Sequence, residues 1–162
     1  MPHVAFDALP DDARVWVFGA SEALDDHRSA ELLREVDGSL AQWEAHGQPL
    51  TCARDWRDSR FLAIGVDQST AGASGCSIDA LFRVLQRLER SLGTSLLAGG
   101  RVFYRDTDGQ VRCVDRATYA ARARAGEVQG DTPVFDTTLT SARAYRDRFE
   151  CSAGSSWHAR LA

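Results

Sequence analysis

Two nearly continuous apolar runs constrain the fold of this chain most strongly: RVWVFGA at residues 14–20 and RFLAIGVDQ at residues 60–68. Their β-branched and aromatic residues favour strands, and the scarcity of polar positions indicates that both faces of each strand are covered. The sequence therefore predicts two strands in the interior of a sheet rather than strands with one face in water.

Two amphipathic helices are predicted to cover that sheet. Residues 26–46 carry apolar side chains along one helix face, at Leu33, Val36, Leu40 and Trp43. Gly47 follows the predicted end of this helix, as is typical of a helix stop. Residues 77–92 carry a second apolar stripe and are followed by Gly93, a natural C-terminal residue for a helix.

Two hairpins are predicted from turn residues between strand-like segments. Residues 49–57 alternate apolar and polar positions, and a tight turn at Asp58 joins them to the second apolar run. Residues 101–116 contain Asp108-Gly109, a strong hairpin signal, between two alternating segments.

The order of elements through the first strand of the second hairpin is β-α-β-β-α-β. This order is typical of the ferredoxin-like arrangement, an α+β fold in which two helices cover one face of an antiparallel sheet. A short helix at 117–126, a strand at 132–140 and a tail follow. We expect a single α+β domain over residues 1–162, with a ferredoxin-like core at 1–106 and a C-terminal extension at 107–162.

Composition excludes several functions. The formal net charge of −4 gives no sign of a nucleic-acid partner, and no apolar run has the length of a membrane span. The N-terminal residues lack the pattern of a signal peptide, so we expect a cytoplasmic protein. All 19 basic residues are arginine, which excludes a Schiff-base lysine and a Walker-A lysine within this chain.

The four cysteines and four histidines are widely separated. They form no C-x-x-C pair and no H-E-x-x-H motif, so we expect reduced thiols, no metal site and no cofactor.

Several segments resemble, in the same order, a family of small bacterial proteins of uncharacterised function whose members often carry the label "ABC transporter ATPase". The segments are PDDARVWVF, WEAHGQPL, RFLAIGVDQ, ASGCSID, TPVFDTTLT and SWHARL, of which ASGCSID and the terminal SWH-x-R are the most specific. The resemblance covers nearly the whole chain but implies no catalytic residue. An ABC ATPase needs G-x-x-x-x-G-K-[ST], and a chain without lysine cannot supply it. We therefore reject the label for this sequence.

The small-residue turn Gly72–Asp79 is the first candidate site. Its glycines permit close backbone approach, and free amides at the start of a helix can bind a phosphate or carboxylate. The first hypothesis is a binding module for a small anionic ligand or the acidic group of a protein partner, with His158 assisting at the site. The residues predicted to bind the ligand are Gly75, Cys76, Ser77, Asp79, Trp157 and Arg160.

A cysteine-dependent enzyme is the second hypothesis. A helix N-terminus lowers the pKa of a thiol, so Cys76 is the predicted nucleophile. His46, expected at the end of the first helix, or His158 would act as the base. The amides of Ser77 and Ile78 would hold the oxyanion.

A third hypothesis gives these segments structural roles only. The turn would then change the chain direction, Cys76 would be a small buried apolar residue, and SWHARL would fasten the tail to the body of the protein. In that case the protein would be a structural or interaction subunit with an apolar surface for a partner.

Overall fold

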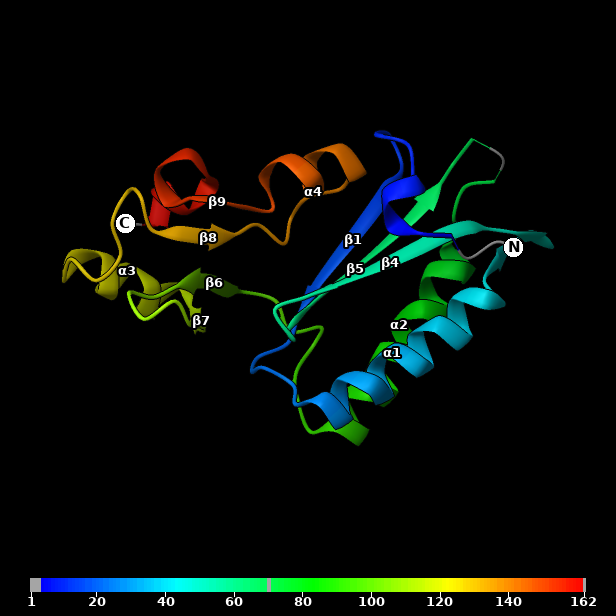
Figure 1. Ribbon diagram of the computed structural model, residues 1–162, viewed down its shortest axis with the longest axis horizontal. Helices are drawn as coiled ribbons and strands as arrows, with labels where there is room; N and C mark the ends of the chain where they lie inside the picture. Colours follow the sequence, from blue (N-terminus) through cyan, green and yellow to red (C-terminus); the bar gives the residue numbers. More distant parts are fainter. Residues whose placement is uncertain (1–3, 70, 162) are drawn as a thin grey trace. The chain divides into compact units, whose positions relative to one another are not determined.

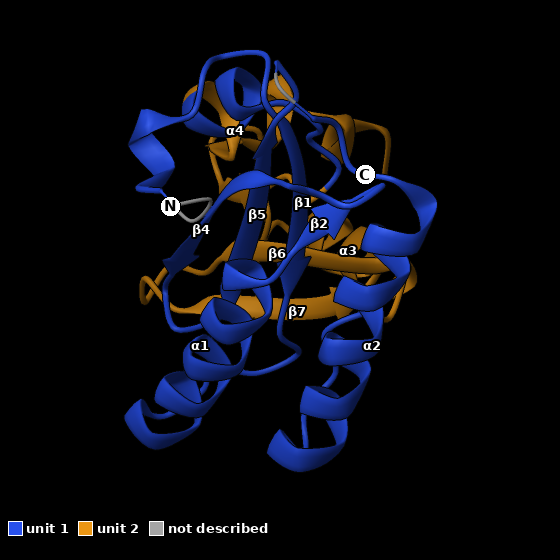
Figure 2. Cartoon of the chain, turned by 90° about the vertical axis from the view of Figure 1, so that its right-hand side faces the viewer, with its two compact units in different colours: residues 1–97, 138–146 blue, residues 98–137, 147–162 orange. Residues whose placement is uncertain are grey.

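The computed structural model describes residues 4–69 and 71–161, which divide into two compact units (Figures 1 and 2). The first unit comprises residues 1–97 and 138–146, and the second comprises residues 98–137 and 147–162. The protein is α+β with antiparallel sheets, as the sequence predicts. No helix among the described residues is both long and apolar enough to span a membrane.

The sheet of the first unit contains β1 (Arg14–Gly19), β5 (Phe61–Asp67) and β4 (Thr51–Arg57), in the order β1-β5-β4. Both outer strands run antiparallel to β5 and are therefore parallel to each other. This is a split βαβ unit, with β5 inserted between two parallel strands. The position of β5 confirms the prediction made from its nearly uninterrupted apolar sequence, whereas β1, predicted in the same way, is an outer strand of this three-stranded sheet.

Two helices, α1 (Asp26–Ala41) and α2 (Gly75–Leu92), cover one face of this sheet (Figure 1). Leu32, Leu40 and Leu85 are fully buried in the core that the helices share with the strands. Asp25 begins α1 by accepting a hydrogen bond from the Arg28 amide at 2.8 Å. The predicted stripe of the first helix is confirmed at Val36 and Leu40, but Leu32 rather than the half-buried Leu33 faces the core.

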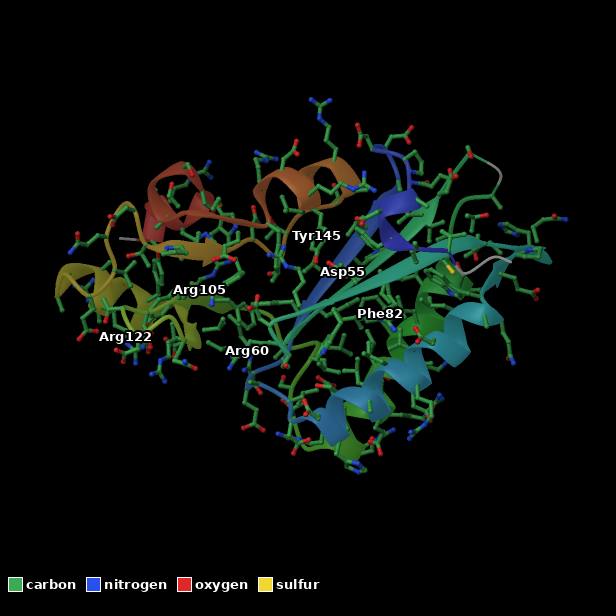
Figure 3. All side chains as sticks on the ribbon, viewed as in Figure 1. Asp55, Arg60, Phe82, Arg105, Arg122 and Tyr145 are labelled. Carbon is green, nitrogen blue, oxygen red and sulfur yellow. The ribbon has the colours of Figure 1, made fainter. Side chains whose placement is uncertain are left out.

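The opposite face of the sheet is covered by the short helix η1 (Phe6–Ala8) and by Tyr145 of α4 (Ala142–Arg148). A Cβ atom at Gly65 would lie 2.4 Å from Leu9 Cδ1, so a larger residue there would displace the Leu9 side chain. The Tyr145 hydroxyl donates a hydrogen bond of 2.7 Å to Asp55 Oδ2, and Figure 3 shows the two side chains pointing toward each other. Both faces of β5 are thus buried, which explains its apolar sequence.

The first helix is shorter than predicted. It ends at Ala41, and a two-stranded ribbon follows, formed by β2 (Glu44–Ala45) and β3 (Gln48–Pro49). His46 and Gly47 form its turn with φ values of 51° and 77°, the left-handed conformation that a tight hairpin requires. The expectation that His46 ends a helix is therefore wrong.

The second unit contains a sheet of the order β7-β6-β8-β9. Its strands are β6 (Arg101–Arg105), β7 (Val111–Asp115), β8 (Pro133–Phe135) and β9 (Glu150–Ser152). Its helices are α3 (Arg116–Arg124), η2 (Ala153–Ser155) and η3 (Trp157–Leu161). The β6–β7 hairpin confirms the prediction from Asp108-Gly109.

Two expectations about this region are corrected. β6 pairs with β7 and β8 rather than with the first sheet, so it is not the fourth strand of a sheet with β1. The strand expected at 132–140 is limited to the three residues of β8, and it is followed by a further strand, β9.

Candidate functional site

The turn before α2 is organised by a capping box between two serines. The Ser74 side chain accepts a hydrogen bond from the Ser77 amide at 3.1 Å, and the Ser77 hydroxyl accepts one from the Ser74 amide at 2.7 Å. The Ile78 amide donates to the Ser74 carbonyl at 3.0 Å. Capping of this kind satisfies donors that a helix N-terminus otherwise leaves free.

This geometry removes the predicted oxyanion donors, because the Ser77 and Ile78 amides already have partners within the turn. Cys76 is the second residue of α2 and is exposed. Gly75 and Asp79 are exposed as well, whereas Ser77 is buried and its carbonyl accepts a 2.7 Å hydrogen bond from Trp43 Nε1. The Gly72–Asp79 turn therefore anchors α2, and its hydrogen bonds are directed inward.

The two histidines proposed as bases lie in different settings. His46 is exposed at the tip of the β2–β3 ribbon in the first unit. His158 belongs to the second unit and is fully buried there. Burial lowers the pKa of His158 to about 4, so its imidazole is neutral at pH 7. A neutral ring with no exposed atom is poorly placed to activate an exposed thiol.

The SWHARL segment packs onto the core of the second unit. Trp157 stacks on His158 with ring centroids 3.9 Å apart, and Trp157 Nε1 donates a 3.1 Å hydrogen bond to Asp136. Ser156 Oγ lies 2.7 Å from His158 Nδ1. Of the residues predicted to bind a ligand here, only Arg160 is exposed. The segment thus contributes core packing, with His158 at its centre.

A hollow of about 400 Å³ lies elsewhere in the second unit, beside the β6–β7 turn and the C-terminal half of α3. Its lining residues are Tyr104, Asp106, Thr107, Arg112, Arg122 and Glu127. Two guanidinium groups from different elements therefore face one space. Figure 3 labels Arg122 at its position on α3.

Arg112 and Asp106 form an ion pair beside the β6–β7 turn. Arg112 Nε donates to Asp106 Oδ2 at 2.6 Å, while Asp106 Oδ1 accepts the amides of Asp108 and Gln110 at 2.9 Å each. The hydrogen bond from Arg112 is the main reason that the pKa of Asp106 lies below its ordinary value. Asp106 is thereby committed to the turn, and it fixes the direction of the guanidinium.

Arg122 is oriented by Tyr104. Its Nη1 donates to the Tyr104 hydroxyl, and its guanidinium carbon lies 5.9 Å from the centre of the tyrosine ring. Glu127 is the nearest acid, with Oε2 at 3.9 Å from Arg122 Nε and a side chain that is 65% exposed. The Glu127 carboxylate is therefore a loose, movable partner.

The sequence reasoning missed this hollow. One signal was available: a hairpin centred on Asp108-Gly109 places Tyr104 directly opposite Arg112, as the register shows. Nothing local indicated that α3 would bring Arg122 to the same place, since α3 has almost no apolar stripe.

In residues 4–69 and 71–161, no group of three or more His, Cys, Asp or Glu side chains is arranged to hold a metal ion. Comparisons of the chain with protein-family models, curated proteins and solved structures found no match.

Proposed function

We propose that the protein is a binding module for a small anionic ligand, and that the ligand's oxyanion binds in the hollow lined by Arg112 and Arg122. The ligand class is the one expected from the sequence, but the site differs. The Gly72–Asp79 turn is replaced because the Ser74 and Ser77 amides are paired in the capping box and the Ile78 amide donates to the Ser74 carbonyl. The observation that carries the proposal is that two oriented guanidinium groups with unused donors line the same 400 Å³ hollow.

The unused donors can be named. Within the described residues, Arg112 donates through Nε only, which leaves both of its Nη groups without a protein acceptor. Arg122 Nη2 likewise has no acceptor there, and the Tyr104 hydroxyl accepts from Arg122 without donating in return. Arginine donors arranged in this way match the paired oxygens of a carboxylate or phosphate.

The two acids in the lining, Asp106 and Glu127, balance the two guanidinium charges, so their engagement decides whether an anion can bind. Asp106 already accepts three hydrogen bonds, from Arg112 and the two turn amides, out of about four that a carboxylate can accept. Glu127 is exposed and 3.9 Å from Arg122, so an incoming oxyanion can displace it into water at little cost. Glu127 then competes with the anion for Arg122, so removing its charge should raise the affinity for the anion.

The experiment is calorimetric titration with inorganic phosphate and with malonate, using sodium chloride at matched ionic strength as the blank. Replacement of either guanidinium by an amide, Arg112→Gln or Arg122→Gln, should weaken binding about tenfold or more, because a charge-assisted hydrogen bond is lost. Glu127→Gln should strengthen binding.

Arg124→Gln is the matched control, because Arg124 is exposed on the same helix and does not line the hollow. It changes the net charge equally and should leave affinity unchanged. The absence of heat and of thermal stabilisation with both anions would refute the proposal. If Arg124→Gln weakens anion binding as much as the other two variants do, the binding reflects the net charge of the protein and the proposed site is wrong.

We further propose that the first unit is a variant of the ferredoxin-like arrangement, in which residues 139–142 take the edge position of a fourth strand beside β1. Supporting contacts are the Val15 amide to the Thr140 carbonyl at 2.9 Å and the Ala142 amide to the Ala13 carbonyl at 3.0 Å. Arg14 and Ser141 form an isolated antiparallel bridge between them. Hydrogen exchange of the Val15 amide as slow as that of β5 amides is the expected result, and rapid exchange would contradict it.

A further inference from the structure

The hollow beside the β6–β7 turn presents hydrogen-bond acceptors as well as donors. Glu127 Oε2 lies 3.9 Å from Arg122 Nε, which is beyond hydrogen-bonding distance, and the Glu127 side chain has no hydrogen bond within residues 4–69 and 71–161. Asp106 accepts three hydrogen bonds and has room for about one more. Unused carboxylate acceptors therefore line the same hollow as the unused guanidinium donors of Arg112 and Arg122.

A plain anion uses only the donors of this lining. It pairs with the guanidinium groups, but it leaves the acceptors unsatisfied and lies close to two charges of its own sign. The lining as a whole, with two arginines and two acids, carries no net formal charge. A ligand that has a cationic donor in addition to its oxyanion pairs with both kinds of group, so it fits the lining better than an anion alone.

The charged groups of the hollow are open to solvent. The side chains of Arg112, Arg122 and Glu127 are 51%, 36% and 65% exposed, and that of Asp106 is 19% exposed. A ligand therefore reaches all four from water without any movement of the core. The volume of about 400 Å³ lies within the range of small-molecule sites, roughly 300–1,000 Å³.

We propose that the ligand of this hollow is a free α-amino acid. Its carboxylate binds the donors of Arg112 and Arg122, and its ammonium group donates to Glu127 and to the remaining acceptor of Asp106. An ammonium group has three donors and no acceptor, so a pair of carboxylates suits it. Because Glu127 lies beside Arg122, the two charges of the ligand have to be close together, as they are when both groups are attached to one carbon atom. This inference rests on the anion proposal and names the ligand class of the same site.

The test compares aspartate with succinate by calorimetric titration of the full chain at matched ionic strength. The two compounds share a carbon skeleton and both carboxylates, and they differ only in the ammonium group. Aspartate should bind about three- to fivefold more tightly, which is the gain expected from an ion pair with an exposed carboxylate. Equal affinities, or tighter binding of succinate, would overturn the inference.

Glu127→Gln should change the two affinities in opposite directions. It removes the partner of the ammonium group, so aspartate should bind about three- to fivefold more weakly. It also removes a competitor for Arg122, so succinate should bind more tightly. A variant that is merely misfolded would lose both ligands, and a variant that binds both more tightly would overturn the inference.

Asp131→Asn is the matched control, because Asp131 is exposed in the same unit and does not line the hollow. It removes one negative charge, as Glu127→Gln does, and should leave the ratio of the two affinities unchanged. An equal change of that ratio would show that the preference reflects net charge, and the inference would be wrong.

Titrations with phosphate and malonate separate this inference from the anion proposal. If these two anions bind but aspartate has no advantage over succinate, the amino acid is the wrong ligand class and the anion site stands. If none of the four compounds binds, both proposals are wrong.

Discussion

Replacement of Tyr145 by phenylalanine tests the packing of the first unit most directly. The change removes one hydroxyl that donates to Asp55 Oδ2 at 2.7 Å, and it keeps the ring in edge contact with Phe6 at 5.3 Å between centroids. A hydrogen bond to a charged acceptor contributes about 1.5–3 kcal/mol. Asp55 is only partly buried and regains some hydration, so we expect a loss of about 2 kcal/mol in the free energy of unfolding.

The same variant should change the response to alkaline pH. Burial, followed by the hydrogen bond to Asp55, raises the pKa of Tyr145 far above its ordinary value. The unfolded chain therefore releases this proton above about pH 10 while the folded chain retains it, so stability falls as pH rises. Tyr145→Phe should reduce that decline by about 1.4 kcal/mol per pH unit, the slope for one proton.

Urea denaturation followed by tryptophan fluorescence at pH 7, 9, 10 and 11 measures both effects. Tyr119→Phe serves as the control at pH 7, because the Tyr119 hydroxyl has no hydrogen bond within the described residues, and it should cost well under 1 kcal/mol. A loss below about 0.5 kcal/mol for Tyr145→Phe, or an alkaline slope equal to that of the wild type, would refute the reasoning.

Three further predictions concern the helix cap, the thiols and acid stability. Ser74→Ala removes the capping box and should cost about 1 kcal/mol in urea denaturation, whereas a neutral effect would show that the cap is dispensable. Ellman's reagent should modify exposed Cys76 in the folded protein but reach Cys52 only after unfolding, because burial raises the pKa of Cys52 to about 11; early labelling of Cys52 would contradict its burial. His158 is protonated near pH 6.5 in the unfolded chain but only near pH 4 in the folded one, so stability should fall by up to about 3 kcal/mol as pH drops through this range. His158→Gln should remove that dependence. If the stability of this variant falls with pH as in the wild type, His158 is not the cause.

The hairpins were predictable because their signals are local. Asp58 and Gly109 lie in the turns that join β4 to β5 and β6 to β7, and the register of each pair follows from the turn. The end of α1 was not predictable in the same way. Trp43 lies at helical spacing from Leu40, but it is held by a hydrogen bond to Ser77 on α2, a tertiary contact that periodicity does not reveal.

The assignment of β6 to the wrong sheet has a similar cause. Its sequence RVFYR is compatible with any buried strand, and its partner β8 lies about thirty residues further along the chain. At the candidate site, the position of Cys76 at the start of a helix was visible in the sequence. The reciprocal bond from the Ser74 amide to the Ser77 hydroxyl was not, because a serine at that position replaces the glutamate or glutamine of the usual capping box.

The division of the chain between its two units affects the order in which they are completed during synthesis. Residues 138–146 supply the last part of the first unit, and residues 147–161 supply β9 and the buried His158 of the second. A ribosome releases the N-terminal residues first. The Val15 amide of β1 therefore has no partner until Thr140 emerges, and β8 cannot pair with β9 until residues 150–152 emerge. A nascent chain paused after residue 137 would therefore hold two unfinished units, and the same late segment would complete both of them within seconds.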